Sequence, residues 1–333
     1  MNYCILGAGA WGTAVAIHLE RMGHNTSLVP RRSEHAAEIV KSGENRAYLP
    51  GFPIGSGLRV TADVEIAREC DVVFLAAPSK GLRCLCETLR DRLGTRNRRI
   101  VYLALCKGLE AETNLAPSAV IGTVFPESVH GTVSGPTYAG EVAAGRPAAV
   151  VLAVNRESES SRRIPLDLSN EQIRVYTSDD LPGVELGACL KNIYAIAAGI
   201  CDGFELGDNA KAALITRSVA EMVRLGVSLG GEAETFYGLS GFGDLIATCN
   251  GSWSRNRGFG QQIAEGVAIM ELIETRKMTV EGYGSTECFF QICRKNGLDA
   301  PILVEIHKVL FGGKDCRASI RDLMTRQLKP ESC

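Results

Sequence analysis

The sequence predicts an α/β dinucleotide-binding domain of the Rossmann type, followed by an all-helical domain. Three observations predict this. A short apolar strand runs directly into a Gly-x-Gly-x-x-Gly turn and a helix, further apolar strands follow as far as about residue 176, and the remaining periodicity is helical. The length of 333 residues fits about two domains. We expect them at residues 1–180 and 181–333, because the segment 178–182 separates the two patterns.

The composition is that of an ordinary globular protein, with 45% hydrophobic and 22% charged residues. A net charge of -2 gives no global attraction to nucleic acid or to a membrane surface, so an anionic substrate needs a local positive cluster. The N-terminal residues lack the pattern of a signal peptide, and we expect no membrane insertion. The twelve cysteines are dispersed without metal-ligand spacing, which predicts reduced thiols, a cytoplasmic location and no metal site.

The glycine-rich turn is placed as a dinucleotide site requires. A strand is expected at residues 2–6, a helix at 13–22 and a second strand at 26–29. Gly7 would permit the tight turn, Gly9 would let the backbone approach a pyrophosphate, and Gly12 would allow close packing of helix on strand. The N–H groups and dipole at the start of the helix would bind the phosphates.

The end of the second strand bears on the choice of cofactor. NAD-selective sites usually carry a carboxylate there, about 20 residues after the glycines, for the ribose 2′-hydroxyl. This chain has Arg31 and Arg32 instead, and guanidinium groups suit a 2′-phosphate. We therefore predict that NADPH is preferred over NADH. The alternative is that one or both arginines are solvated surface charges.

The remaining elements place a second group of candidates. Strands are expected near residues 60–61, 71–76, 100–104, 131–133, 148–153 and 173–177, with a helix at 79–93. Lys107 lies just past the end of one strand, where open parallel sheets bind ligands. The polar segment 155–172, which contains Pro165, predicts a short irregular helix and a mobile loop. Later helices are expected at 186–200, 209–229, 259–270, 285–295 and 302–310.

The helix at 186–200 is apolar nearly all round, yet Lys191 and Asn192 lie in its middle. Burying a lysine charge costs several kcal/mol unless the lysine is paired or its pKa falls. One interpretation is that Lys191 pairs with Glu185 or extends to the surface. The other is that Lys191 is a catalytic lysine in a cleft between the two domains.

Two further segments interrupt the helical pattern. A glycine-rich turn places Asp244 directly before an apolar run. A polar, basic segment places Arg255 and Asn256 just ahead of a helix, where they could hold a phosphate or a carboxylate. The alternative for this second segment is a solvated loop.

Ten ordered motifs span nearly the whole chain: GAGAWGTAVA, NRAYLPG, AAPS, CKGLEAET, SGPTYAGEVAAGRP, ELGACLKNIYAIAAGICDG, NAKAALITRSVAEM, GLSGFGDLIATC, SRNRGFG and VEGYGST. Together they resemble the NAD(P)-dependent glycerol-3-phosphate dehydrogenase family, and most of all its bacterial, biosynthetic branch. The resemblance implies reversible hydride transfer from NADPH or NADH to C2 of dihydroxyacetone phosphate. The product would be sn-glycerol 3-phosphate for phospholipid synthesis, and the enzyme would be a homodimer.

The resemblance also implies individual roles. It makes Lys191 the general acid/base, with Lys107 and Asp244 as further catalytic residues; burial and Lys107 would lower the pKa of Lys191, and Asp244 would limit the fall. The substrate-binding residues would be Lys107, Gly135, Thr137, Asn192, Asp244, Thr248, Ser254, Arg255 and Asn256. The cofactor-binding residues would be Gly7, Gly9, Ala10, Trp11, Gly12, Arg31, Arg32, Tyr48, Lys107, Ala139, Arg255 and Glu281.

Two other functions stay open at this point. A related two-domain 3-hydroxyacid or 2-keto acid reductase could share the plan and the lysine–asparagine pair, and would differ in how it holds the anionic end of its substrate. A non-enzymatic NADP-binding sensor or scaffold is the other alternative. Such a protein is expected to have lost Lys191, Lys107 or the group at 254–256, all of which are present.

Overall fold

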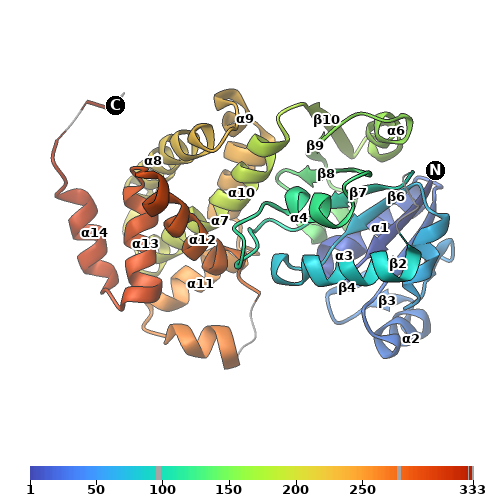
Figure 1. Ribbon diagram of the computed structural model, residues 1–333. Helices are drawn as coiled ribbons and strands as arrows, with labels where there is room; N and C mark the ends of the chain where they lie inside the picture. The colour runs from blue at the N-terminus through green and yellow to red at the C-terminus, as the bar shows by residue number, and fades with distance from the viewer. Residues whose placement is uncertain (95–98, 276–278, 329, 332–333) are drawn as a thin grey trace.

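The computed structural model describes residues 1–94, 99–275, 279–328 and 330–331. Two lobes lie side by side: an α/β lobe that holds the N-terminus and a helical lobe that holds the C-terminus (Figure 1). The predicted fold class is therefore confirmed, with a Rossmann-like sheet in the first lobe and a helical second lobe.

The α/β lobe is built on one eight-stranded sheet in the order β10-β9-β8-β7-β6-β1-β2-β5. Neighbouring strands are parallel except β8 and β9, which are antiparallel. The strand order reverses beside β1, so the ligand crevice of such a sheet is expected at the carboxyl ends of β1 and β6. The strands are β1 (Asn2–Leu6), β2 (Asn25–Val29), β5 (Leu58–Val60), β6 (Val72–Leu75), β7 (Val101–Ala104), β8 (Val129–Ser134), β9 (Ala148–Val154) and β10 (Ile173–Ser178).

Helices cover both faces of this sheet, as its continuous apolar strands require. Alternate residues of β1 face opposite cores: Tyr3 and Ile5 pack with α1 and α5, whereas Cys4 and Leu6 pack with α3 and α4. A small hairpin of β3 (Glu44–Asn45) and β4 (Leu49–Pro53) lies beside the sheet. The helices are α1 (Ala10–Arg21), α2 (Ser33–Ser42), α3 (Ser79–Leu93), α4 (Pro117–Val124), α5 (Ala139–Ala143) and α6 (Glu159–Leu168).

Helix α6 confirms that the polar segment forms a short helix, and corrects the expectation that this helix is irregular. The hydroxyl of Ser158 accepts from the backbone N–H of Ser161, and the Ser161 hydroxyl accepts from the N–H of Ser158, so the helix begins with a reciprocal cap. Ile164 and Leu168 are buried, which gives the polar segment one apolar side. Pro165 lies inside the helix, where its ring removes one backbone N–H donor.

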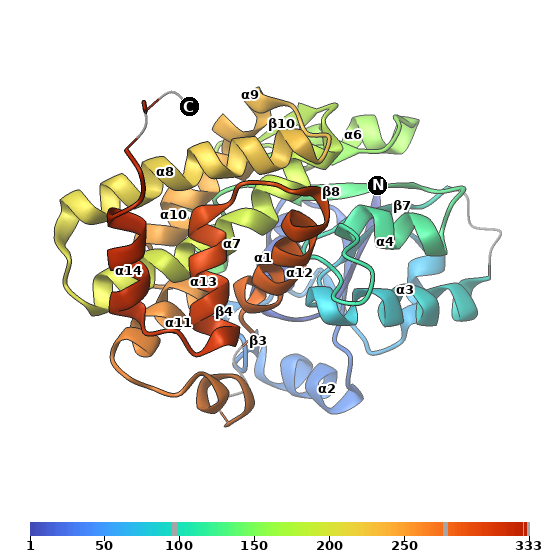
Figure 2. The same ribbon diagram turned by 60° about the vertical axis from the view of Figure 1, so that its left-hand side comes forward.

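In the helical lobe, α7 (Leu181–Gly203) runs through the centre and packs against α8, α10, α11 and α12 (Figure 2). It begins earlier than the predicted 186–200, because Asp180 caps its first turn and Pro182 fits there. The helix expected at 259–270 is instead α11 (Arg255–Ala264), which ends before Gly266 with its positive φ of 90°. The other helices are α8 (Gly207–Ser228), α9 (Ala233–Tyr237), α10 (Asp244–Asn250), α12 (Glu281–Asn296), α13 (Pro301–Gly312) and α14 (Cys316–Met324).

Of the described helices, only α7 is long and apolar enough to cross a membrane by length and composition. Its most apolar stretch is 94% buried inside the protein. The apolarity of α7 is therefore explained by its place in the core of the helical lobe.

Candidate active site

The glycine-rich turn between β1 and α1 has the conformation that its sequence predicts. Gly7 has φ of 115°, a region that favours glycine, and a Cβ there would lie 2.7 Å from the carbonyl oxygen of Ala76. A Cβ at Gly12 would lie 2.2 Å from the carbonyl oxygen of Gly7. The first and third glycines thus allow the turn and the close packing of helix on strand.

The turn offers hydrogen-bond donors of the kind that a dinucleotide phosphate needs. A Cβ at Gly9 would meet no described atom within 4 Å, so the backbone there faces open space. No described side chain caps the start of α1, which leaves its first N–H groups available to a phosphate. The indole N–H of Trp11 is buried and has no acceptor among the described residues. These donors suit the predicted cofactor contacts at Gly9, Ala10 and Trp11.

Asn45 is a supporting residue that sequence reasoning did not single out. Its amide nitrogen donates to the carbonyl oxygen of Ala8 (2.9 Å) and to the hydroxyl of Thr13 (2.8 Å). It therefore ties the β3–β4 hairpin to both ends of the glycine turn. Asn45 lies in the motif NRAYLPG, which signalled family membership but not this contact.

The residues predicted to bind the adenosine end of the cofactor lie near this hairpin and the end of β2. Arg31 and Arg32 directly follow β2 and Pro30, and both are exposed. Neither has a side-chain partner within the described part of the chain, so both guanidinium groups are available to an anion. Tyr48 is half exposed, with its ring centroid 5.4 Å from that of His35.

Lys107 and Gly135 meet at the carboxyl edge of the sheet. Lys107 follows β7 and Gly135 follows the neighbouring parallel strand β8. The Lys107 ammonium donates to the carbonyl oxygen of Gly135 (2.9 Å) and to Oδ2 of Asp244 (2.6 Å), which lies at the start of α10. Lys107 therefore joins the α/β lobe to the helical lobe.

Lys191 reaches the same carboxylate from the middle of α7. Its ammonium donates to Oδ1 of Asp244 (3.0 Å) and to the hydroxyl of Thr248 (2.7 Å). Thr248 lies one turn after Asp244 on α10, so a single helical face presents both partners. The structure brings together the four predicted residues Lys107, Lys191, Asp244 and Thr248.

Burial and charge set the protonation of this cluster. Burial lowers the pKa of Lys191 to about 8; the Asp244 carboxylate limits the fall, and the ammonium of Lys107 adds to it. Burial would raise the pKa of Asp244, but the ammonium groups of Lys107 and Lys191 outweigh it and hold that pKa below its usual range. The two lysines share one buried carboxylate, which leaves a local excess of positive charge for an anionic substrate.

Two buried amides form a chain of hydrogen bonds beside the cluster. The N–H of Gly282 donates to Oδ1 of Asn256 (2.9 Å), Asn256 donates to Oδ1 of Asn192 (2.8 Å), and Asn192 donates to the carbonyl oxygen of Lys107 (2.8 Å). Because the chain starts at a backbone donor and ends at a backbone acceptor, it fixes the orientation of both amides. It therefore links α12, α11 and α7 to the backbone that carries Lys107.

The segment 254–256 forms the start of α11. The buried hydroxyl of Ser254 accepts from the backbone N–H of Arg257, so Ser254 is the helix cap. Arg255 is exposed, and its guanidinium has no partner among the described residues. A free guanidinium on the first turn of a helix is well placed for a phosphate. Residues 255–257 thus belong to a helix rather than to a loop, although the Arg255 side chain is exposed to solvent.

The other predicted contacts flank the cluster. The Thr137 hydroxyl donates to the carbonyl oxygen of Gly135 (3.2 Å), and Ala139 begins α5. Glu281, at the start of α12, accepts from the backbone N–H (3.2 Å) and the hydroxyl (2.6 Å) of Ser79. Sequence reasoning missed this contact between the lobes, although Ser79 closes the motif AAPS.

Glu185 does not pair with Lys191, which corrects one of the two interpretations of that helix. Glu185 is buried and accepts from the backbone N–H (2.8 Å) and the hydroxyl of Ser118 at the start of α4. Burial raises the pKa of Glu185 to about 7, while the bonds from Ser118 act in the opposite direction. Lys191 is buried as well, so the lysine does not extend to the surface.

The raised pKa of Glu185 predicts a pH-dependent stability. An unfolded glutamate titrates near ~4.3, so the favourable contribution of the protonated side chain is lost as the pH rises from there through about 7. We expect the melting temperature of Glu185→Gln minus that of the unmodified chain to increase from pH 5.5 to pH 8. Calorimetry measures both temperatures. The exposed Glu159→Gln is the control, and a difference that does not change with pH would contradict the assignment.

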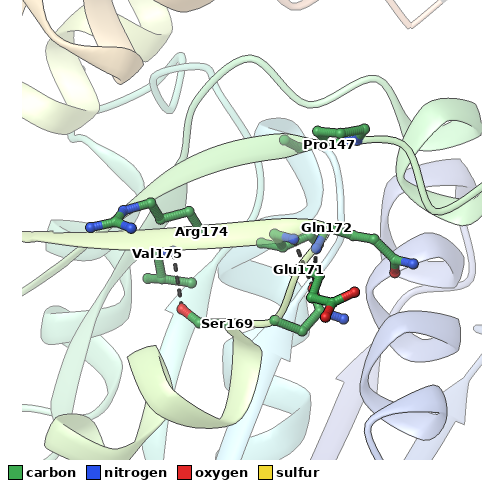
Figure 3. A pocket seen from close by; sticks show the side chains of 9 residues that line it. Pro147, Ser169, Glu171, Gln172, Arg174 and Val175 are labelled. Carbon is green, nitrogen blue, oxygen red and sulfur yellow. Dashed lines mark hydrogen bonds between the residues drawn. The ribbon is translucent and has the colours of Figure 1, made fainter.

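An open pocket of about 470 Å³ lies elsewhere, at the start of β9 and β10 (Figure 3). Its lining residues include Pro147, Glu171 and Arg174, and none of the predicted site residues. In its wall the Asn170 side chain accepts from the backbone N–H groups of Gln172 and Ile173, and the Ser169 hydroxyl accepts from that of Val175. Among the described residues, no group of three or more His, Cys, Asp or Glu is arranged to hold a metal ion.

Comparisons with known proteins show which family the chain belongs to. The sequence pattern described as NAD-dependent glycerol-3-phosphate dehydrogenase N-terminus matches residues 2–160, and the pattern of the C-terminus of the same family matches residues 180–321. The chain belongs to this family. The resemblance carried by the ten motifs is thereby confirmed.

Relatives and structures agree with this membership. The "Glycerol-3-phosphate dehydrogenase [NAD(P)+] 1" of Salinibacter ruber is 43% identical over 332 residues, which cover 98% of this chain and 96% of that protein. A crystal structure of the glycerol-3-phosphate dehydrogenase of Coxiella burnetii superimposes with a TM-score of 0.92 at 35% identity, covering 98% and 99% of the two chains. A ketopantoate reductase from Ralstonia eutropha has a TM-score of 0.61 at 18% identity, covering 97% and 100%, which shows a shared fold alone.

Proposed function

We propose that this chain is an NAD(P)-dependent sn-glycerol-3-phosphate dehydrogenase that interconverts dihydroxyacetone phosphate and sn-glycerol 3-phosphate. The observation that carries the proposal is the buried cluster in which Asp244 bridges Lys107 and Lys191, at the carboxyl edge of a dinucleotide-binding sheet. The family membership of the whole chain and the names of its relatives support it.

Lys191 is the proposed general acid/base. When bound, the nicotinamide cofactor supplies a hydride to C2 of the ketone or accepts one from C2 of the alcohol. In reduction the Lys191 ammonium polarises the C2 carbonyl and donates its proton to the oxygen; in oxidation the neutral amine accepts that proton. A pKa of about 8 gives Lys191 both forms near neutral pH, and Asp244 orients the ammonium.

The substrate phosphate is assigned to the start of α11. Arg255 presents an unpaired guanidinium there, and the cap residue Ser254 and the buried Asn256 fix the first turn of the helix. Binding energy from the phosphate would then position C2 against Lys191. Gly135, Thr137, Asn192 and Thr248 complete the proposed substrate contacts.

The proposed cofactor site combines the glycine turn with the two free arginines after β2. Gly7, Gly9, Ala10, Trp11 and Gly12 would hold the pyrophosphate, as their conformation and open surroundings allow. Tyr48, Lys107, Ala139, Arg255 and Glu281 remain proposed cofactor contacts. Either NADPH or NADH fits the turn, and the arginines favour NADPH.

Arginine replacement tests the cofactor preference. We expect Arg31→Ala and Arg32→Ala each to lower kcat/KM for NADPH by about 10- to 100-fold, because each removes a charge-assisted bond to the 2′-phosphate. The value for NADH should change little. Arg59→Ala, an exposed arginine on β5, is the control. An unchanged NADPH/NADH ratio in both variants would mean that these arginines are solvated charges.

The reductase alternative has weaker support. The ketopantoate reductase shares the fold at 18% identity, whereas the family patterns that match this chain are those of glycerol-3-phosphate dehydrogenase. The sensor alternative does not account for a lysine held in a buried cluster with a pKa lowered to about 8.

The decisive experiment is initial-rate oxidation of NADPH, and separately of NADH, with dihydroxyacetone phosphate. We expect turnover with this substrate and none with unphosphorylated dihydroxyacetone. Turnover of 2-keto acids instead, at equal concentration, would favour the reductase alternative. Binding of NADPH by folded protein without turnover of any of these substrates would favour the sensor.

Three expectations from the sequence remain proposals. The first is that the domain boundary lies between residues 180 and 181, which is supported by the end of β10 at Ser178 and the start of α7 at Leu181. The second is a homodimer, which light scattering at several protein concentrations would test. The third is a cytoplasmic enzyme that supplies phospholipid synthesis, which cell fractionation and complementation of a glycerol-auxotrophic strain would test.

A further inference from the structure

An aromatic stack joins the two lobes at the edge of the site. The rings of Tyr138 and Trp253 have centroids 4.8 Å apart and planes within 7° of parallel. Tyr138 follows β8 in the α/β lobe, and Trp253 lies between α10 and α11 in the helical lobe. The two residues are 115 positions apart in sequence, so only the packing of the lobes brings them together.

Each ring lies close to a glycine of its own turn. A Cβ at Gly251 would lie 2.6 Å from Cε2 and 2.7 Å from Nε1 of Trp253. A Cβ at Gly140 would lie 3.1 Å from Cε1 of Tyr138. Each ring therefore packs closely against its own turn, at a place where a side chain larger than hydrogen would collide with it. Tyr138 remains 38% exposed, so the stack lies at the surface of the protein.

The stack is adjacent in sequence to substrate residues on both sides. Tyr138 lies between Thr137 and Ala139, and Trp253 directly precedes Ser254, the cap of α11. The bonds from Lys107 to Gly135 and Asp244 join the same turn of the α/β lobe to the start of α10, deeper in the site. The turn 135–139 therefore contacts the helical lobe at two places: at Asp244 through Lys107, and just before α11 through the stack.

We propose that Tyr138 and Trp253 are positioning residues that hold the turn 135–139 against the start of α11 and so keep the substrate-binding groups of the two lobes at a fixed spacing. The proposal rests on the proposed function. Neither ring takes part in the chemistry. Losing the stack should therefore weaken the binding of the phosphorylated substrate and leave the proton-transfer step largely unchanged.

Kinetics of ring-removing and ring-keeping variants test this role. An aromatic stack is a weak contact, and its loss changes an equilibrium by about three- to tenfold. We expect Tyr138→Ala and Trp253→Ala each to raise KM for dihydroxyacetone phosphate by that factor, with kcat within about twofold. Tyr138→Phe keeps the ring and should restore the KM. Tyr237→Ala, an exposed tyrosine on α9, is the control.

Tryptophan emission and calorimetry give readouts that need no turnover. The chain has two tryptophans, so subtracting the emission of Trp253→Phe isolates the Trp253 signal. Tyr138→Ala should make that signal more accessible to acrylamide, and should raise the calorimetric Kd for sn-glycerol 3-phosphate three- to tenfold. If Tyr138→Ala weakens the binding of sn-glycerol 3-phosphate but neither the unmodified chain nor any variant shows turnover, the stack proposal is supported and the proposed function is overturned. Unchanged KM and Kd in Tyr138→Ala would overturn the stack proposal.

Discussion

Lys191→Ala is expected to lower kcat for dihydroxyacetone phosphate reduction by about two to four orders of magnitude, the usual contribution of a positioned acid/base. Lys191 is the group that α7 buries against Asp244 and Thr248, and its ammonium would supply the proton that the C2 oxygen takes up. The same loss is expected in the oxidation direction, because the amine that accepts the proton is then absent. Initial rates at saturating substrate in both directions measure it.

The pH dependence of the unmodified enzyme provides an independent check. The acid form of Lys191 is lost as the pH rises through about 8, so the rate of reduction should fall there and the rate of oxidation should rise. Lys295→Ala, an exposed lysine near the end of α12, is the control and should keep both rates. If Lys191→Ala keeps most of kcat, another group moves the proton.

Gly199→Ala is expected to lower kcat/KM by about 100-fold, because displacements on the order of 1 Å can cost that much in catalysis. A Cβ at Gly199 would lie 1.9 Å from the carbonyl oxygen of Arg257, which is backbone and cannot rotate away. A Cβ at Gly260 would lie 2.0 Å from the carbonyl oxygen of Ile196. The backbones of α7 and α11 thus touch, and added volume at the crossing must push α11 away from α7.

This shift would displace the start of α11, which carries the proposed phosphate group Arg255, from Lys191 on α7. We therefore expect KM for dihydroxyacetone phosphate to rise more than KM for NADPH. Overpacking should also cost about 1–3 kcal/mol in the free energy of unfolding, to be measured by chemical denaturation. Gly258→Ala is the matched control on α11, since its Cβ would meet no described atom within 4 Å. Equal values of kcat/KM in Gly199→Ala and Gly258→Ala would show that the close contact between α7 and α11 does not position the site.

Much of the fold could be predicted from local pattern. The strand and glycine turn at residues 2–12 appear as predicted, because apolar alternation and glycine conformation are properties of neighbouring residues. The helix at 79–93 has the predicted bounds. The sequence predicts an irregular helix where α6 is regular, because its polar residues hide a narrow apolar side. The sequence pattern does not predict the short helices α2, α4, α9, α10 and α14, since short helices depend on packing more than on propensity.

For the site, the sequence by itself determined which residues carry charge and where glycine is required. It placed Lys191 in an apolar helix and Lys107 at a strand end. The residue pattern of that helix left the partner of Lys191 open, and only the family resemblance suggested Asp244. Only the tertiary structure decided that Asp244, 53 positions away, is that partner, and that Glu185 on the same helix bonds to Ser118 instead. Contacts between segments distant in sequence follow from how the helices and the two lobes pack. The spacing of residues along the chain therefore does not predict which of them come into contact.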